Sequence, residues 1–197
     1  TPIGVATSLD ADGQRGGLTN WKAVEQDLRD LFTQYKSPTY RFTTLWDFYG
    51  TPDNFPAFAK ARSSPAGSDK AAIVEAELTG HFQEPRFLPY VQMYEFEALV
   101  LAAIDGLKDL YPKQAAALDA FKSQCEMAGN FETIDDGPTT HPAKRIDGVL
   151  PGFWNTKEDD GPIALRTVGL DSPRRWCPRF NNWLARLEKI GESRGTA

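Results

Sequence analysis

The sequence predicts an α/β fold in which a small, mostly parallel sheet is flanked by helices and is followed by a helical C-terminal half. Apolar stretches typical of buried strands alternate with segments of helical periodicity as far as about residue 105. The order strand, helix, strand is typical of a βαβ unit, whose two strands are parallel. From Gly106 onward only helix and loop patterns follow. We therefore expect an α/β core over residues 1–105 and a helical extension packed on it over residues 106–197.

The first expected elements are a strand and a helix. Residues 3–6 form an apolar run that predicts a strand, and residues 8–17 are polar and rich in turn formers. Asn20 is a favourable N-cap, and apolar residues from Trp21 to Tyr35 recur at the spacing of one helical face. Pro38 then predicts the end of this helix.

The remaining elements of the expected core are two strands and two helices. Residues 40–48 are rich in β-branched and aromatic residues without helical period, which predicts a strand buried on both faces. A helix is expected from about Asp69 to Phe82, a short strand over residues 87–93, and a helix over residues 95–104. The clearest helix of the second half is the last one, over residues 180–190.

Composition and charge exclude several classes of protein. The chain has 22 Lys and Arg against 27 Asp and Glu, a net charge of −5, which is the reverse of a protein that coats nucleic acid. The longest apolar stretch, residues 98–104, is far below the roughly 20 residues that cross a bilayer, so we expect no membrane association. Two cysteines and two histidines give no zinc-site spacing, and no signal peptide is visible, so we expect a cytoplasmic protein.

Three carboxylates are the candidate chemical groups. Asp47 comes near the end of the second expected strand, and Glu95 and Glu97 come where the third strand passes into a helix. In parallel α/β sheets the functional crevice lies at these carboxyl ends, so the three acids are candidate ligands of one divalent cation. Hard oxygen ligands favour Mg²⁺ or Mn²⁺, which serve phosphoryl chemistry. Two alternatives stay open. Asp47 caps the following turn, and the two glutamates lie in a first helical turn, where their negative charge interacts favourably with the helix dipole.

A second polar cluster lies in the C-terminal half. Residues 134–138 read Ile-Asp-Asp-Gly-Pro, which is first of all a turn. His141 followed by Pro142 is typical of a helix start, and Lys144 and Arg145 are candidates for contact with phosphate. The same region continues with Lys157 and with Asp160-Gly161-Pro162.

Ordered motifs run along nearly the whole chain: Gly16-Gly17 with Asn20-Trp21, Thr44-Leu45-Trp46-Asp47-Phe48-Tyr49-Gly50 with Phe55-Pro56, Tyr94-Glu95-Phe96-Glu97-Ala98-Leu99, Ile134-Asp135-Asp136-Gly137-Pro138 with Lys144-Arg145-Ile146, Asp160-Gly161-Pro162 to Gly169-Leu170, and Cys177-Pro178-Arg179-Phe180-Asn181-Asn182-Trp183-Leu184. In these motifs the sequence resembles the bacterial domain-of-unknown-function family numbered 4276.

The resemblance implies a Toprim-like fold, as in topoisomerases, primases and overcoming-lysogenization-defect nucleases, and Mg²⁺-dependent cleavage of nucleic acid. It maps the later metal-binding acid of that fold onto Asp47 and makes Glu95 and Glu97 candidate additional ligands. Members of the family often accompany an AAA-type ATPase in phage-defence modules, so an ATPase is the implied partner, with nucleic acid and a second copy of the chain as further candidates.

One departure from the family concerns the first metal ligand. The family opens with a strand ending in Val-Glu-Gly, and this sequence begins with Thr1 after that point. We therefore expect the first strand and its acid upstream of Thr1, or a strand supplied by another chain, because a sheet without it would expose an apolar edge.

Three hypotheses of function follow. The first is a Toprim-like nuclease subunit in which Asp47, Glu95 and Glu97 bind Mg²⁺ while Lys144 and Arg145 bind phosphate. The second is a non-catalytic module that docks on an ATPase through its helical half. The third is an enzyme of a small molecule or nucleotide on the same fold. The docking hypothesis relies on two groups of side chains, namely Trp154, Trp176 and Trp183, and Arg174, Arg175 and Arg179.

Overall fold

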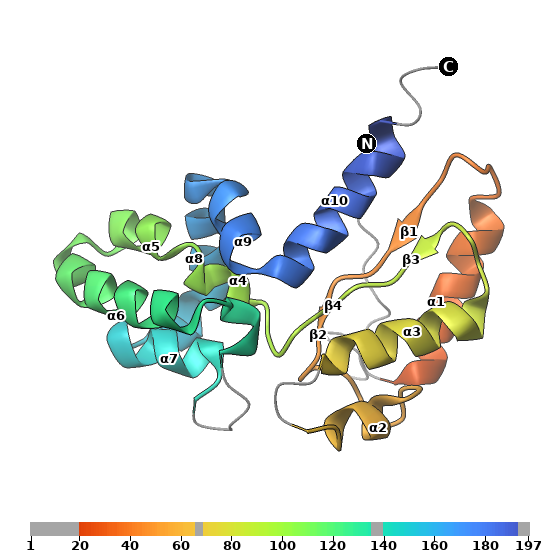
Figure 1. Cartoon of the computed structure of the whole chain (residues 1–197), viewed down its shortest axis with the longest axis horizontal. Helices are drawn as coiled ribbons and strands as arrows, with labels where there is room; N and C mark the ends of the chain where they lie inside the picture. The colour runs from red at the N-terminus through yellow and green to blue at the C-terminus, as the bar shows by residue number, and fades with distance from the viewer. Residues whose placement is uncertain (1–19, 66–68, 135–139, 193–197) are drawn as a thin grey trace. The chain divides into compact units, whose positions relative to one another are not determined.

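The computed structural model describes residues 20–65, 69–134 and 140–192, with side chains as far as Ile190 (Figure 1). The chain divides into two compact units, Thr1–Val91 and Gln92–Ala197. The expected core boundary after residue 105 falls inside a helix of the second unit. The strand expected over residues 3–6 lies outside the described residues, as does most of the turn expected over residues 134–138.

The helices described in the first unit are α1 (Trp21–Gln34), α2 (Phe58–Arg62) and α3 (Lys70–Phe82). Two of these three helices begin at side-chain caps where the sequence predicts a helix, and α2 is a short helix that the sequence did not predict. The Asn20 side chain accepts a hydrogen bond from the amide of Ala23 at 3.0 Å, and the Asp69 carboxylate accepts one from the amide of Ala72 at 3.0 Å. Each cap satisfies an amide that has no partner within its helix, so both predicted helix starts are confirmed.

The described strands have two residues each and form two small sheets: β1 (Phe42–Thr43), β2 (Trp46–Asp47), β3 (Phe87–Leu88) and β4 (Val91–Gln92). β1 pairs with β3 in parallel, with Phe42 opposite Phe87, and β2 pairs with β4. The chain between β1 and β3 includes α3, so a βαβ connection joins the parallel pair.

Each long strand expected from sequence is thus two short strands, because the backbone ladder is interrupted between them. The Thr44 hydroxyl takes the place of a backbone partner: it accepts from the Tyr90 amide at 2.9 Å and donates to the Tyr90 carbonyl at 2.9 Å. Pro89, which precedes Tyr90, has no amide hydrogen to donate. The strands expected over residues 40–48 and 87–93 were therefore right in place and wrong in continuity.

Aromatic rings of α1, α3 and the β1–β3 pair contact one another. Phe32 of α1 contacts Phe42 of β1, Phe82 of α3 and Phe87 of β3, at ring-centroid distances of 4.9, 5.4 and 5.4 Å. Edge-on and tilted contacts of this kind stabilise a core beyond the area they bury. The short strands of this unit are therefore held by side chains more than by their ladder.

The second unit is built of helices in its described part: α4 (Glu97–Leu101), α5 (Ile104–Leu110), the 3₁₀ turn η1 (Pro112–Gln114), α6 (Ala115–Ala128), the 3₁₀ turn η2 (Phe131–Thr133), α7 (Pro142–Val149), α8 (Phe153–Val168), α9 (Asp171–Trp176) and α10 (Pro178–Glu192). The expected helical C-terminal half is confirmed, and so is the last helix.

The helix expected over residues 95–104 is instead two helices with a tight turn between them. The amide of Ala102 bonds to the carbonyl of Leu99 at 3.0 Å, three residues back, and the Ala102 carbonyl accepts the Ser172 hydroxyl at 2.6 Å. A carbonyl engaged by a distant hydroxyl and a tightened turn both interrupt the regular helical pattern. Periodicity found the apolar face but not this break.

Helices α5 and α8 pack at very short range. A Cβ on Gly106 of α5 would lie 2.3 Å from the carbonyl oxygen of Ala164 in α8, so only glycine allows this approach. A Cβ on Gly161 of α8 would lie 3.1 Å from the Cγ2 atom of Val100, a tight contact with a side chain. Gly161 is therefore what the Asp160-Gly161-Pro162 motif supplies to this packing.

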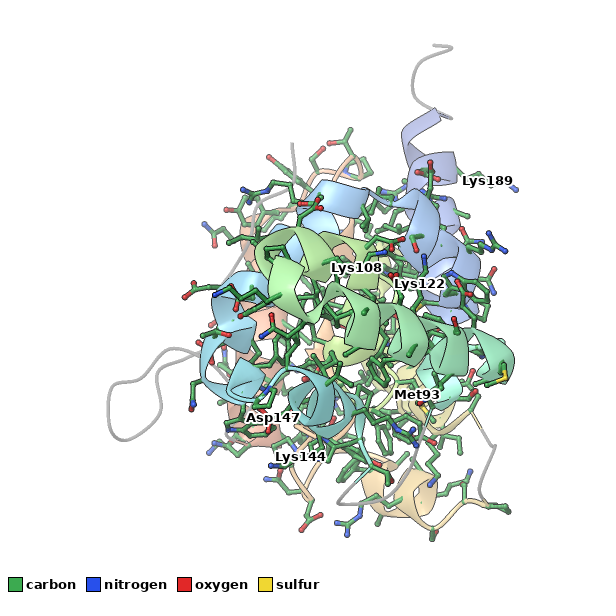
Figure 2. The ribbon with its side chains drawn as sticks, turned by 90° about the vertical axis from the view of Figure 1, so that its left-hand side faces the viewer. Met93, Lys108, Lys122, Lys144, Asp147 and Lys189 are labelled. Atoms are coloured by element: carbon green, nitrogen blue, oxygen red, sulfur yellow. The ribbon has the colours of Figure 1, made fainter. Side chains whose placement is uncertain are left out.

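Ion pairs join α5 to α6 at the surface of the same unit. The Lys108 ammonium lies 2.8 Å from Asp105 and 2.6 Å from Asp119, and Lys122 lies 2.6 Å from Asp105. Figure 2 labels the two lysines on neighbouring helices. Hydrogen bonds from Lys108 and then Lys122 hold the pKa of Asp105 below its ordinary value.

Candidate functional site

Glu95 lies between β4 and α4, the first helix of the second unit. Tyr94 is buried and has a left-handed backbone with φ of 62°, an uncommon conformation for a residue other than glycine. The next residue, Glu95, places its Oε2 atom 2.9 Å from Nδ1 of His141 and 3.2 Å from the amide of Ala143. His141 makes no side-chain cap for α7. The Glu95 carboxylate instead accepts an amide at the start of this helix, where its negative charge interacts favourably with the positive end of the helix dipole.

Glu97 begins α4 and is almost entirely buried. Only 7% of its side chain is exposed, and its Oε1 atom lies 2.9 Å from the ammonium of Lys157 on α8. A carboxylate buried to this degree needs such a partner, because desolvation of an unpaired charge costs on the order of several kcal/mol. The ion pair ties α4 to α8.

Trp154 contacts the partners of both glutamates, His141 and Lys157. The ammonium of Lys157 lies 4.4 Å from the indole ring, the ammonium of Lys144 lies 4.9 Å from it, and the His141 ring contacts it edge-on at 6.1 Å. The contacts form an open chain from Glu95 through Trp154 to Glu97, with Lys144 as a branch on the indole. We call these six side chains the Trp154 cluster: Glu95, Glu97, His141, Lys144, Trp154 and Lys157.

The backbone around Trp154 is fixed by Asp147 of α7. The Asp147 Oδ1 atom accepts hydrogen bonds from the amide of Gly152 at 3.1 Å and from the amide of Trp154 at 3.2 Å. Gly152 has φ of 98°, which a residue with a Cβ rarely adopts. Figure 2 labels Asp147 and Lys144 on α7, so one helix supplies both the anchor of the indole and one of its cations.

The oxygen atoms of the cluster fit a divalent cation in part. Glu95 uses one carboxylate oxygen on His141 and the Ala143 amide, and Glu97 uses one on Lys157. Among the described residues the other oxygen of each glutamate makes no further hydrogen bond or ion pair. Mg²⁺ commonly takes one or two protein carboxylates and completes its shell with water and substrate phosphate. Within the described residues, no group of three or more His, Cys, Asp or Glu side chains is placed to hold a metal ion.

Asp47 lies in the first compact unit, at the end of β2. Its carbonyl accepts hydrogen bonds from the amide of Gly50 and from the hydroxyl of Thr51, both at 3.1 Å. This is the turn after a strand that the sequence predicts for Asp47. That Asp47 shares one metal ion with Glu95 and Glu97 stays a prediction.

Lys144 and Arg145, the candidate phosphate contacts, have different surroundings although both are exposed. Lys144 lies against Trp154, whereas Nε of Arg145 donates to the carbonyl of Thr140 at 2.6 Å and so holds the start of α7. Of the two, only Lys144 belongs to the Trp154 cluster. Their contact with phosphate stays a prediction.

Three members of the cluster were named in the sequence analysis but not as metal or phosphate ligands. His141 is the residue before α7, as its following proline predicts, and the same position brings it to Glu95. Trp154 and Lys157 are three residues apart on one helix, a spacing that places them on one face. The pairing of Lys157 with Glu97 has no local signal, since 60 positions separate them.

The side chains of the docking hypothesis are mostly engaged within their own unit. The Trp176 ring stacks on Phe131 at 4.9 Å, Arg174 pairs with Glu188, and Arg175 lies 4.7 Å from the Trp176 ring. Trp176 and Arg174 therefore already have structural contacts that a docking role would have to share.

Both cysteines are buried free thiols. Burial raises the pKa of Cys125 to about 11 and raises the pKa of Cys177 well above its ordinary value. Because the thiolate is the nucleophilic form, neither thiol is a candidate nucleophile.

A family model described as "Domain of unknown function (DUF4276)" matches residues 1–188, which is nearly the whole chain. The chain belongs to that family. The Trp154 cluster lies entirely within the matched residues, as does Asp47. Searches of curated proteins and of solved structures gave no match.

Membrane spanning is the remaining point that the described residues address. Each helix in this part of the chain is too short or too polar to cross a bilayer.

Proposed function

We propose that the Trp154 cluster belongs to the active site of a hydrolase that cleaves phosphodiester bonds with a divalent metal ion, and that this chain is a nuclease subunit. The observation that supports this most is the arrangement of charge. Two sparsely exposed carboxylates, Glu95 and Glu97, are paired with His141 and Lys157, and the ammonium groups of Lys144 and Lys157 lie against one exposed aromatic ring. Metal-binding oxygens next to phosphate-binding cations are the parts that such hydrolysis requires.

In this proposal Glu95 and Glu97 would hold Mg²⁺ or Mn²⁺. The ion supplies activation of water and neutralisation of charge on the phosphate. His141 and the Ala143 amide fix the orientation of the Glu95 carboxylate through its Oε2 atom. Lys157 is held between Glu97 and the indole, so its ammonium is placed to bind a phosphate oxygen of a substrate that reaches the ring.

The proposal includes the finer features implied by the family resemblance: a Toprim-like sheet, Asp47 as a third acid, and an AAA-type ATPase as partner in phage defence. Co-expression with an ATPase encoded beside this chain, followed by co-purification, tests the partner. A stable complex supports it, and two separately eluting proteins contradict it.

The direct test measures metal binding and cleavage in the same preparations. Mn²⁺ is titrated calorimetrically into the full chain and into the Glu97→Gln, Glu95→Gln and Asp47→Asn variants, with circular dichroism to check folding. We expect saturable binding in the wild type and a loss of at least about tenfold in affinity in Glu97→Gln, because one ligand oxygen is replaced by an amide.

The matched control is Glu158→Gln, since Glu158 is an exposed glutamate next to Lys157 on α8. It should bind Mn²⁺ as the wild type does. End-labelled DNA and RNA are then incubated with each protein and Mg²⁺ or Mn²⁺, and cleavage should disappear in Glu95→Gln, Glu97→Gln and Asp47→Asn but persist in Glu158→Gln. Absence of Mn²⁺ binding to the wild type, or unchanged binding and cleavage in Glu95→Gln and Glu97→Gln, overturns the proposal.

A further inference from the structure

The indole of Trp154 is unusual among the tryptophans of this chain. The sequence has five, all within the described residues, and Trp154 is the one that is exposed, at 44% of its surface. An exposed indole is a large apolar surface that water covers at a cost, roughly 25 cal/mol per Å². Its exposure therefore needs a reason that packing within the unit does not give.

The groups that cover the ring are the ends of flexible side chains. The ammonium groups of Lys144 and Lys157 lie within 4.9 and 4.4 Å of its centroid, at the distance of cation–π contacts. Lys144 is exposed and makes no ion pair with a described carboxylate. The Lys144 side chain can swing aside at little cost, so the ring face that it covers is available to a flat ligand.

The ring itself is held in place. Asp147 accepts the amides of Gly152 and Trp154, and His141 contacts the indole edge. A fixed aromatic surface binds with little loss of conformational freedom. This is the requirement for a stacking platform.

From this geometry we infer that Trp154 stacks on an unpaired nucleobase of a single strand, with the neighbouring phosphate bound by Lys144. The inference rests on the proposed function for the choice of nucleic acid as ligand, and it adds the kind of strand. A base within a duplex has both faces covered by its neighbours, whereas an unpaired base offers a face to an aromatic side chain. A cation beside the aromatic platform matches the phosphate beside the base.

The test measures binding in EDTA, so that neither metal binding nor cleavage contributes. Fluorescence anisotropy follows a labelled 12-residue oligothymidylate, a blunt DNA hairpin of similar charge, and the mononucleotide AMP as a competitor. Wild type is compared with Trp154→Ala, Trp154→Phe, Lys144→Gln and the charge-matched control Lys113→Gln, which changes an exposed lysine of the same unit.

We expect Trp154→Ala to weaken strand binding by about tenfold or more and Trp154→Phe to recover most of it, because phenylalanine still stacks. Lys144→Gln should weaken binding about threefold and reduce the slope of log K against log salt concentration by about 0.7, as expected for one lost phosphate contact to a single strand. Lys113→Gln and hairpin binding should not change.

Three results overturn the inference: no binding of the strand by the wild type, equal binding of the strand by Trp154→Ala and wild type, or AMP binding as tight as that of the strand. The phenylalanine variant keeps the test decisive if the alanine variant does not fold. Failure here together with loss of Mn²⁺-dependent cleavage in Glu97→Gln would remove the stacking role and leave the hydrolase proposal intact.

Discussion

The two compact units of this chain are stabilised in different ways. In the first, two-residue strands are held by aromatic rings and by side chains that bond to distant backbone, such as Arg86, which donates to the carbonyls of Phe32 and Tyr35 at the end of α1. In the second, helices approach so closely that glycine is required, and a fully buried carboxylate closes a helix start. The first unit therefore depends on aromatic contacts and on side-chain bonds to backbone that water partly reaches, and the second on close helix packing around a fully buried carboxylate.

Two glutamates, one in each unit, illustrate this difference. Glu132 of the second unit has no exposed surface and accepts the amides of Arg179 and Phe180, at 2.7 and 3.2 Å, at the start of α10. Glu84 of the first unit pairs with Arg86 at 2.8 Å, and 17% of its side chain is exposed. Loss of a buried, fully engaged carboxylate should cost more than loss of one that water reaches.

The largest effect is expected for Glu132→Ala. The change leaves two amides of α10 without a buried acceptor, so we expect the free energy of unfolding to fall by about 3 kcal/mol, and by about half that in Glu132→Gln, which keeps one acceptor oxygen. Urea unfolding followed by circular dichroism measures it. Glu126→Ala, on half-buried α6 surface, is the control and should lose about 0.5 kcal/mol or less. Equal losses in Glu132→Ala and Glu126→Ala would contradict this account of the second unit.

The next largest effect on stability is expected for Gly106→Ala. Its new methyl group would overlap the Ala164 backbone, which cannot rotate away as a side chain would. We expect a loss of about 2 kcal/mol despite the better helix propensity of alanine. Gly148→Ala in α7 meets no atom within 4 Å and should instead gain up to about 1 kcal/mol. If both variants gain stability, close helix packing is not what holds the second unit.

The smallest effect is expected for the pH dependence of the stability of the first unit. Hydrogen bonds from Arg86 lower the pKa of Glu84 from 4.5 to about 2. A carboxylate with a lowered folded pKa stabilises the fold above its unfolded pKa, and this contribution is lost as pH falls from about 4.5 towards 2. We expect the pair to contribute about 1 kcal/mol at pH 6, less than full linkage predicts because solvent screens it.

Stability curves of wild type and Glu84→Gln should therefore converge between pH 5 and pH 2. Other carboxylates with lowered pKa, such as Asp105, are present in both proteins and cancel in the difference. Glu77→Gln, at an exposed position of α3, should run parallel to the wild type throughout. A constant difference between Glu84→Gln and wild type down to pH 2 would show that the ion pair is not the source of the acid sensitivity.

The candidate site could be predicted only in its separate parts. Glu95, Glu97 and Lys144 are visible in the sequence as an acidic strand-to-helix junction and as a basic pair after a helix start. His141 was correctly placed before α7, but its contact with Glu95 was not, because 46 residues separate the two and the contact depends on how α7 packs.

The sequence by itself determined where most helices start and the α/β class of the fold, because caps, prolines and apolar spacing act over only a few residues. Asn20, Asp69 and Pro142 each mark a helix start that the structure has. The tertiary structure alone decided that Thr44 interrupts a strand, that Ser172 interrupts a helix, and that Lys157 reaches Glu97. These contacts join residues 46, 70 and 60 positions apart, and no local periodicity carries information over such distances.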